Sequence, residues 1–370
     1  MTNSARADPS LDTDEVRAVV EGRLGRLTLD RPRAINALTP AMVGALRRQL
    51  LAWREDPAVD AVWLDGAGDR GLCAGGDIKR VRDLIVAGEL GELRDFWAEE
   101  YLLDRLIARY PKPVVAIAHG MTMGGGLGLA GHASHCVVTE STRIAMPEVA
   151  IGLAPDVAGL WLLSRLPSEI GTLAALSGRR LDATESLATG LARHFVPGNR
   201  IERTRARLAA ADRLDAVRIA ELLAGPGPAS PASPGPSGML ADADLVARTF
   251  AGADLRAILG RLRALTERDD VPTWAAEAYA AISAGSPTAL AVTLAGLRRA
   301  ETMSAPEECW IQDLRVCQHF ARGHDLSEGI RAQVVDKDRN PRWRPARPDE
   351  VTRDAVLEYF APIGPDLSFE

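Results

Sequence analysis

The sequence predicts an α/β layered fold over its first 200 residues, followed by a mainly helical region. Short apolar segments that read as buried strands alternate with helical segments up to about residue 200, which is the pattern of α/β proteins. After Ile201 the sequence becomes rich in Ala, Leu and Arg at helical spacing. Hydrophobic residues make up 46% of the 370 residues, enough for a buried core, so we expect a folded globular protein.

Local signals predict the first strands and the first long helix. Residues 15–29 read as two strands joined by a turn near residues 22 to 25, since Val, Leu and Thr flank a glycine-containing break. Thr39 and Pro40 are a good cap and first residue for a helix that reaches about Arg54. Further buried strands are expected at 59–65, 112–119, 135–140 and 142–146.

The region after residue 200 is interrupted by GPGPASPASPGPSG, in which proline and glycine oppose regular structure. Helical periodicity resumes from about Ala241, and Ser286 followed by Pro287 marks the start of a helix that extends to about residue 300. We therefore divide the chain into a flexible N-terminus (1–14), an α/β core (15–200), a helical C-terminal region (201–345) with a surface loop at 225–238, and a C-terminal tail (346–370).

Composition and charge argue against several functional classes. Lys and Arg number 44 against 50 Asp and Glu, with no long run of one sign, so a nucleic-acid partner is not expected. The polar N-terminus lacks an apolar signal segment, and no stretch has the roughly 18 uninterrupted apolar residues of a membrane span. We expect a cytoplasmic protein without a membrane partner. Four scattered cysteines and six dispersed histidines predict neither disulfides nor a metal site.

The glycine-rich segment HGMTMGGGLGLAG, residues 119–131, allows three interpretations. Gly126, Gly128 and Gly131 match the G-x-G-x-x-G of dinucleotide sites, but HGMTM separates the preceding strand from the first glycine of the run. The glycines can also simply permit close helix packing. Alternatively, they open a helix whose first N–H groups have no partner within the helix and can stabilise a developing oxyanion.

A second glycine turn, GLCAGGDIKRV, follows a strand and can present the N–H of Gly76. With RPRAINAL (31–38), CAGGDIK (73–79) and MGGGLGL (123–129), the chain resembles the enoyl-CoA hydratase/isomerase (crotonase) superfamily. The resemblance implies a spiral of ββα units with a helical C-terminal region. It also implies that the amides of Gly76 and Gly125 form an oxyanion hole for the carbonyl of an acyl-CoA thioester.

Hydratases of this superfamily use two glutamates, and the first of these positions is Gly128 here, whose hydrogen side chain cannot transfer a proton. The second position is Glu148. The segments GMTMGGGLGL, MPEVAIGLAPDVAG, SPTAL, RGHDLSEGIRA and DKDRNPRW resemble 3-hydroxyisobutyryl-CoA hydrolases more than hydratases. This resemblance implies Glu148 and Asp156 as the catalytic pair, Glu100 as a substrate contact, and a role in valine catabolism.

The residues around the two acids support such a role. Pro147, Gly152 and Pro155 interrupt any continuous helix, which places Glu148 and Asp156 at turns. No G-x-S-x-G motif appears, so a carboxylate is expected to act as a nucleophile or as a base for water. The second acid would orient the water or the substrate's 3-hydroxyl, and two nearby acids in an apolar site resist full ionisation.

Each acid also has a structural interpretation. Glu148 can be a charge at a helix N-terminus, and Asp156 can cap a helix that begins near Gly159. Glu100 can face solvent from an amphipathic helix. Asp77 can cap the helix after CAGGD instead of contacting a ligand.

The superfamily resemblance implies further substrate contacts, made mainly through backbone and packing. These residues are Arg33, Ala34, Ala74, Asp77 and Ile78. His324 and Asp325 are interpreted as a structural turn. No cofactor is expected because CoA is part of the substrate, and relatives commonly form trimers or pairs of trimers.

Three functional hypotheses follow. The first is a thioester hydrolase that releases CoA and a short 3-hydroxy acid. The second is an enoyl-CoA hydratase or isomerase, and the third is an acyl-CoA-binding protein without catalysis. Acyl length, stereochemistry and the choice between an anhydride and direct attack by water stay open at this point.

Overall fold

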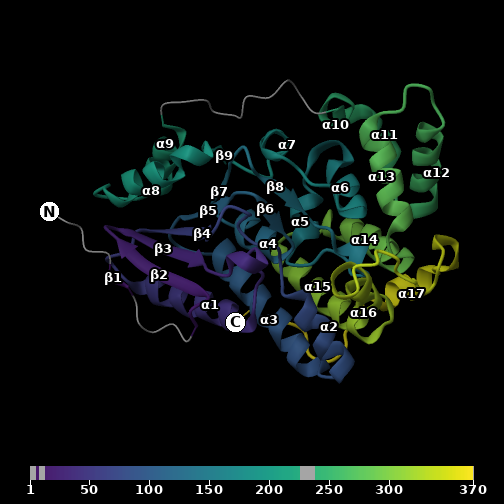
Figure 1. Cartoon of the computed structure of the whole chain (residues 1–370), viewed down its shortest axis with the longest axis horizontal. Helices are drawn as coiled ribbons and strands as arrows, with labels where there is room; N and C mark the ends of the chain where they lie inside the picture. The colour runs from purple at the N-terminus through teal and green to yellow at the C-terminus, as the bar shows by residue number, and fades with distance from the viewer. Residues whose placement is uncertain (1–5, 8–12, 226–237, 370) are drawn as a thin grey trace. The chain divides into compact units, whose positions relative to one another are not determined.

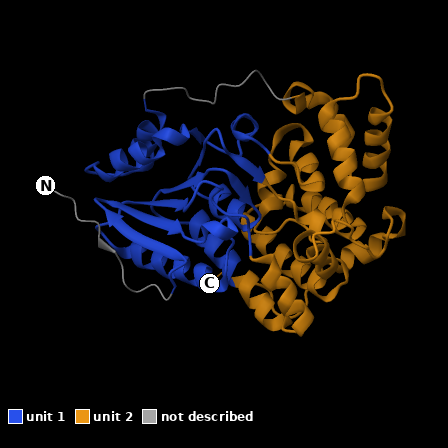
Figure 2. Cartoon of the chain, in the orientation of Figure 1, with its two compact units in different colours: residues 1–76, 99–144, 181–235 blue, residues 77–98, 145–180, 236–370 orange. Residues whose placement is uncertain are grey.

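The computed structural model of the chain describes residues 6–7, 13–225 and 238–369 (Figure 1). They form two compact units, each assembled from separate segments of the chain (Figure 2). Unit 1 comprises residues 1–76, 99–144 and 181–235, and unit 2 comprises residues 77–98, 145–180 and 236–370. Most of the predicted N-terminal segment (1–14) and of the predicted loop (225–238) lies outside the described residues.

Unit 1 is built on a sheet whose described strands run in the order β1-β2-β3-β4-β5-β7-β9. Strands β1, β2 and β3 pair antiparallel, and the predicted hairpin turns at Gly22, whose φ is +60°. From β3 onward each neighbouring pair is parallel. The bounds are β1 (Arg6–Ala7), β2 (Val16–Glu21), β3 (Leu24–Leu29), β4 (Ala61–Gly66), β5 (Val114–Ala118), β7 (His135–Val138) and β9 (His194–Phe195).

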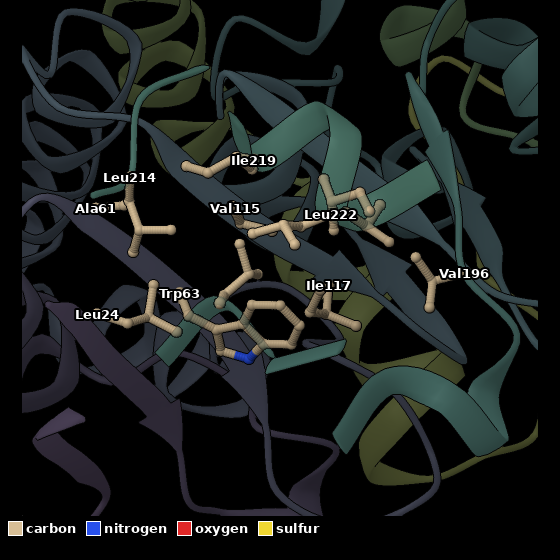
Figure 3. Packing of buried hydrophobic residues seen from close by; sticks show 12 residues of the cluster. Leu24, Ala61, Trp63, Val115, Ile117, Val196, Leu214, Ile219 and Leu222 are labelled. Atoms are coloured by element: carbon tan, nitrogen blue, oxygen red, sulfur yellow. The ribbon is translucent and has the colours of Figure 1, made fainter. Parts of the chain in front are cut away.

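One face of this sheet is covered by α8 (Ile201–Ala209) and α9 (Ala216–Ala224). Alternate residues of a strand point to opposite faces, and Trp63 of β4 and Val115 of β5 point to this one. Figure 3 shows Ile219 and Leu222 of α9 directed toward these side chains. Helices α8 and α9 therefore belong to unit 1, although they follow residue 200 in the sequence. The predicted boundary between an α/β core and a helical region near residue 200 stays a prediction.

The other face carries the intervening strand residues, such as Val62 and Leu64. It packs against α1 (Pro40–Glu55), the end of α3 (Leu90–Ala108) and α4 (Gly125–Gly131). Helix α1 begins as predicted, since the Thr39 side chain accepts a hydrogen bond from the Met42 amide at 3.2 Å. The remaining short elements of unit 1 are η1 (Pro32–Ala34), α7 (Ala183–Ala188) and η4 (Gly198–Arg200).

A second, two-stranded sheet has one strand immediately before the glycine run and one strand after it. It pairs β6 (Met121–Met123) with β8 (Arg143–Ala145). A dinucleotide site requires the glycine turn to follow a strand of the main parallel sheet directly. Here β6 intervenes between β5 and α4, and α4 is only 7 residues long. The dinucleotide interpretation of G-x-G-x-x-G therefore does not fit this fold.

Unit 2 is helical, and the described residues after 200 contain no strand. Helix α14 (Pro287–Ala300) begins at the predicted Ser286 cap, whose hydroxyl accepts from the Ala289 amide at 3.1 Å. The other elements are α2 (Ile78–Ala87), η2 (Glu148–Ile151), α5 (Gly159–Leu163), η3 (Pro167–Glu169), α6 (Ile170–Ser177), α10 (Gly238–Ala241), α11 (Ala243–Phe250), α12 (Leu255–Thr266), α13 (Thr273–Ala284), α15 (Pro306–Arg322), α16 (Asp325–Ile330), η5 (Arg331–Val335), η6 (Pro348–Glu350) and α17 (Arg353–Glu358).

The helices of the described residues differ from membrane-spanning helices in length and composition. None of them is by itself long and apolar enough to cross a bilayer. Helices α13 and α14 meet the length and composition criteria only when taken together, and the pair is bent by 117°.

Candidate active site

The two predicted oxyanion turns adjoin each other in unit 1. A Cβ atom built on Gly75, beside Gly76, would lie 3.6 Å from the amide nitrogen of Gly125. Gly75 has a φ of +98°, a conformation that side chains other than hydrogen rarely allow. Gly125 is the first residue of α4, so its N–H has no partner within the helix. The structure thus brings the two glycine turns together.

Backbone hydrogen bonds fix the first of these turns from two sides. The Gly75 carbonyl accepts from the Leu38 amide at 2.8 Å, and the Cys73 carbonyl accepts from the Met123 amide at 2.9 Å. The Cys73 thiol is buried, and this burial, with the nearby Glu100 and Asp104 carboxylates, raises its pKa to about 12. Cys73 is therefore a neutral packing group, as expected for a buried free cysteine.

Asn36 is a residue of this site that the sequence analysis missed. Its side-chain amide donates to the carbonyls of Gly71 and Leu72, each at 3.1 Å, and its oxygen accepts from the Arg31 amide at 2.9 Å. It is fully buried and has a φ of +53°, which Asn tolerates better than most residues. Asn36 thereby ties the RPRAINAL segment to the loop before Gly76. The sequence signal was an Asn inside an otherwise apolar stretch.

Glu100 points into unit 1 rather than toward solvent. Glu100 is buried, with 3% of the residue exposed, whereas the side chain of the neighbouring Glu99 is 51% exposed. A Cβ atom built on Gly125 would overlap Oε1 of Glu100, and it would lie 3.0 Å from Leu38 Cδ1. The alternative of a solvent-facing Glu100 is therefore wrong, and the structure places this carboxylate beside Gly125.

Asp104 lies one helical turn beyond Glu100 on α3 and was not predicted. It is fully buried, and a Cβ atom on Gly128 would lie 2.7 Å and 2.9 Å from its two carboxylate oxygens. Similarly, a Cβ on Gly126 would lie 2.5 Å from the Cys73 carbonyl oxygen. Close packing is thus the role of Gly126 and Gly128, while Gly125 opens the helix.

Glu148 and Asp156 are both buried in unit 2, with 7% and 8% of their surface exposed. Glu148 opens the short 3-10 helix η2, which ends at Gly152 with a φ of +74°. Asp156 lies before a turn in which the next two residues, Val157 and Ala158, have φ values of 53° and 52°. As predicted from the prolines and Gly152, no continuous helix crosses this segment.

The two acids influence each other. Burial and the charge of Asp156 raise the pKa of Glu148 well above its usual value. The Oε2 atom of Glu148 is buried, and no described residue forms a hydrogen bond with it. The pair therefore retains a proton at a pH where an isolated glutamate is ionised. Such a pair can supply an acid and a base at the same time.

The structure also tests whether Asp156, Asp77 and Asp325 have structural roles, such as capping a helix. Helix α5 is preceded by Ala158 without a side-chain cap, so Asp156 does not cap it. Asp77 does cap α2, because its side chain accepts from the Arg80 amide at 3.4 Å. Asp325 accepts hydrogen bonds from the Ser286 hydroxyl at 2.6 Å and from the Arg344 amide at 2.8 Å, which agrees with the predicted structural turn.

The other predicted substrate contacts are accessible or half-buried. Arg33 and Ala34 are exposed in η1, and Ala74 and Ile78 are half-buried. The Ala74 amide donates to the Ile35 carbonyl at 2.9 Å, which joins the loop of Ala74 to the end of η1. Within the described residues, no group of three or more His, Cys, Asp or Glu side chains is arranged to hold a metal ion.

Comparison with known proteins identifies the family. A family model described as enoyl-CoA hydratase/isomerase matches residues 24–360. The chain belongs to the enoyl-CoA hydratase/isomerase family. A curated relative, the mitochondrial 3-hydroxyisobutyryl-CoA hydrolase of Gallus gallus, is 37% identical over 347 residues, covering 93% of this chain and 88% of the relative.

Solved structures of the enoyl-CoA hydratase/isomerase family confirm the predicted fold class. A carnitinyl-CoA dehydratase from Mycobacterium thermoresistibile has a TM-score of 0.87 at 41% identity, covering 97% of this chain and 99% of that chain. An enoyl-CoA hydratase from Rhodobacter sphaeroides 2.4.1 has a TM-score of 0.86 at 39% identity, covering 96% and 100%. One of these proteins is named a dehydratase and the other a hydratase.

Proposed function

We propose that the protein hydrolyses 3-hydroxyisobutyryl-CoA to CoA and 3-hydroxyisobutyrate. The observation that carries this proposal is the buried Glu148–Asp156 pair, in a chain whose residue 128 is glycine. The curated relatives named 3-hydroxyisobutyryl-CoA hydrolase support the choice of substrate.

In this reaction the thioester oxygen accepts hydrogen bonds from the amides of Gly76 and Gly125. Negative charge develops on this oxygen as the carbonyl carbon becomes tetrahedral, and each such donor supplies about 3 kcal/mol of transition-state stabilisation. Glu100 lies beside Gly125, where it holds the substrate and the turn in place. The CoA portion of the substrate contacts a further set of residues, which are Arg33, Ala34, Ala74, Asp77 and Ile78.

Glu148 acts as the nucleophile or as the base that activates water. An oxygen bonds to the thioester carbon, the carbon–sulfur bond breaks, and the departing thiolate takes a proton from the acid pair. Asp156 orients the water or the 3-hydroxyl group of the substrate. Because the pair retains a proton in the resting protein, one carboxylate can accept a proton while the other donates one.

A single turnover in ¹⁸O-labelled water detects an anhydride that water opens at the Glu148 carbonyl. If Glu148 forms an anhydride and water then attacks the Glu148 carbonyl, the label enters Glu148 and the product acid contains no label from the first turnover. If water attacks the thioester directly, or the acyl carbonyl of an anhydride, the label enters the product acid. Mass spectrometry of the product and of the peptide that contains Glu148 reads both outcomes.

The hydratase alternative is supported by the names of the solved relatives. It requires an acid that this chain lacks at residue 128, where the Asp104 carboxylate fills the adjoining space. A thiol-release assay with 3-hydroxyisobutyryl-CoA and 3-hydroxypropionyl-CoA tests the proposal directly. Absence of released thiol would reject hydrolysis, and rapid loss of crotonyl-CoA absorbance without thiol would establish hydration.

The third hypothesis, binding without catalysis, predicts tight CoA binding and no turnover of any acyl-CoA. We expect Glu148→Gln and Asp156→Asn each to reduce turnover at least about tenfold while acyl-CoA binding persists, because a general base contributes about 10²- to 10⁴-fold. Glu55→Gln is a matched control, since the Glu55 side chain is 77% exposed on α1. Near-normal turnover in either active-site variant removes that residue from its role.

The cellular setting belongs to the same proposal. We place the reaction in valine catabolism and in the cytoplasm, although the curated relatives are named as mitochondrial. The reaction needs no cofactor beyond the CoA of the substrate. A trimer or a pair of trimers is the proposed assembly, and light scattering after size-exclusion chromatography measures it.

A further inference from the structure

Helix α15 carries a buried row of side chains at four-residue spacing. Cys309, Asp313 and Cys317 are 0%, 2% and 0% exposed, and residues four apart lie on the same face of a helix. An acidic side chain is costly in such surroundings unless it forms hydrogen bonds. The sequence analysis assigned no role to Asp313, and the proposed mechanism does not use it.

Asp313 is bound to the turn that carries Asp156. Its Oδ2 atom accepts a hydrogen bond from the Ala158 amide at 2.7 Å, across 155 residues of sequence. The Cys317 thiol lies 3.8 Å from Oδ2 of Asp156 itself. Neighbouring side chains of one helix therefore contact both the catalytic acid and the backbone two residues beyond it.

The turn between these contacts is strained. Val157 and Ala158 both have left-handed φ values, near 53° and 52°, and this conformation is unfavourable for a β-branched valine. Strained backbone of this kind persists only when its surroundings fix it. The hydrogen bond from Ala158 to Asp313 is such a constraint, and it fixes the backbone two residues beyond Asp156.

We propose that Asp313 is a positioning residue for Asp156: it anchors the strained turn and places a third acidic group next to the Glu148–Asp156 pair. This inference rests on the proposed function, because it concerns the same acid pair. It assigns Asp313 no contact with the substrate.

The electrostatics of unit 2 agree with this arrangement. Burial and the charge of Asp156 raise the pKa of Asp313 well above its usual value, against the lowering effect of the Ala158 amide. The groups that act on Asp313 are thus Asp156, the Ala158 amide and the Cys309 thiol, and Arg165 acts in turn on Cys309. Asp156 raises the pKa of both Glu148 and Asp313, so the charge of Asp156 links the two other acids.

Two substitutions separate the anchoring role from the electrostatic role. Asp313→Asn keeps an oxygen that can accept from Ala158 but removes the ionisable group. We expect it to retain turnover within about threefold and to move the acidic limb of the pH profile to lower pH. Asp313→Ala removes the acceptor, and we expect at least a tenfold loss of turnover. Asp65→Asn, at a buried aspartate of unit 1, is the control: it should lower stability without moving the acidic limb.

A second measurement, which does not depend on enzymatic activity, tests the same inference. We expect ¹³C carboxyl resonances of Glu148 and Asp156 to titrate at lower pH in Asp313→Asn than in the wild type. If those titrations coincide, or if folded Asp313→Ala retains wild-type turnover, the inference is wrong. Absence of thiol release by the wild type refutes the proposed hydrolysis instead, and the carboxyl titrations still decide whether Asp313 is coupled to the pair.

Discussion

The carboxylate of Glu100 occupies the space that a side chain on residue 125 would need. This contact links α3 to the first turn of α4, where the proposed oxyanion donor lies. Glycine at residue 125 therefore serves two purposes. It opens the helix with a free amide, and it admits a buried carboxylate next to that amide.

Gly125→Ala should reduce kcat/KM at least tenfold, because the added methyl group displaces Glu100 and shifts the amide that we propose binds the thioester oxygen. Gly91→Ala is the matched control, since Gly91 is exposed on the same helix as Glu100 and a Cβ there meets nothing within 4 Å. Steady-state thiol release measures both variants, and equal rates for Gly125→Ala and Gly91→Ala would contradict the assignment.

A double-mutant cycle tests the Glu100 contact itself. In an Glu100→Ala background the methyl group of Gly125→Ala has more room, although Leu38 Cδ1 stays close. We expect the stability loss caused by Gly125→Ala to be smaller in that background, with a coupling of about 0.5–3 kcal/mol. Chemical denaturation of the four proteins gives the coupling, and additive losses would show that the two residues do not interact.

Gly128→Ala should destabilise the protein by about 1–3 kcal/mol, because it overpacks the site against the buried Asp104 carboxylate. Asp104→Ala should relieve part of this cost. For the same steric reason, we expect Gly128→Glu to gain no hydratase activity. Appearance of crotonyl-CoA hydration in Gly128→Glu would show that the space beside Asp104 accepts a catalytic side chain.

Glu148→Gln should make the folded protein more stable at neutral pH. The pKa of Glu148 is raised on folding, so the native state binds a proton more tightly, and this favours folding most at low pH. As pH rises above the unfolded value near 4.5, the wild type loses this advantage at about 1.4 kcal/mol per pKa unit of elevation. The gain in Tm from Glu148→Gln should therefore grow from pH 4 to pH 8. A Tm gain that does not change with pH would show that the stabilisation comes from packing and not from the raised pKa of Glu148.

Arg331 follows helix α16 in unit 2 and forms ion pairs both with that helix and with the segment after it. Its guanidinium contacts Glu328 at 2.8 Å, Asp336 at 2.7 Å and Asp338 at 2.7 Å. This pairing lowers the pKa of Glu328 to about 2, so the ion pair stabilises the protein fully above pH 4.5 and is lost as pH falls through about 2.

We expect Arg331→Ala to lower Tm at pH 7 and to have a much smaller effect at pH 2. Arg347→Ala is the control, because Arg347 forms a pair with Asp349 while its side chain is 66% exposed. Differential scanning calorimetry at the two pH values compares the variants. Equal Tm losses for Arg331→Ala and Arg347→Ala at pH 7 would count against a stabilising cluster.

The sequence determined the features that depend on a few neighbouring residues. The hairpin at residues 15–29 follows from Val, Leu and Thr on both sides of a glycine turn, and the starts of α1 and α14 follow from Thr39 and Ser286 before proline. Family motifs then indicated the glycine turns and the Glu148–Asp156 segment. The signals for the hairpin and the helix starts are local in the sequence. The family motifs are recognised from residue types at fixed spacing.

Tertiary structure alone decided which distant groups meet. The burial of Glu100, the Asp104 carboxylate beside Gly128, and the hydrogen bond from Ala158 to Asp313 each join segments that local periodicity cannot connect. The grouping of α8 and α9 with the sheet also depended on packing, because their apolar faces cover strand residues far away in the chain. The physical reason is that helix and strand patterns report which face of an element is apolar, whereas burial of that face against a particular partner sets the contacts and the pKa values.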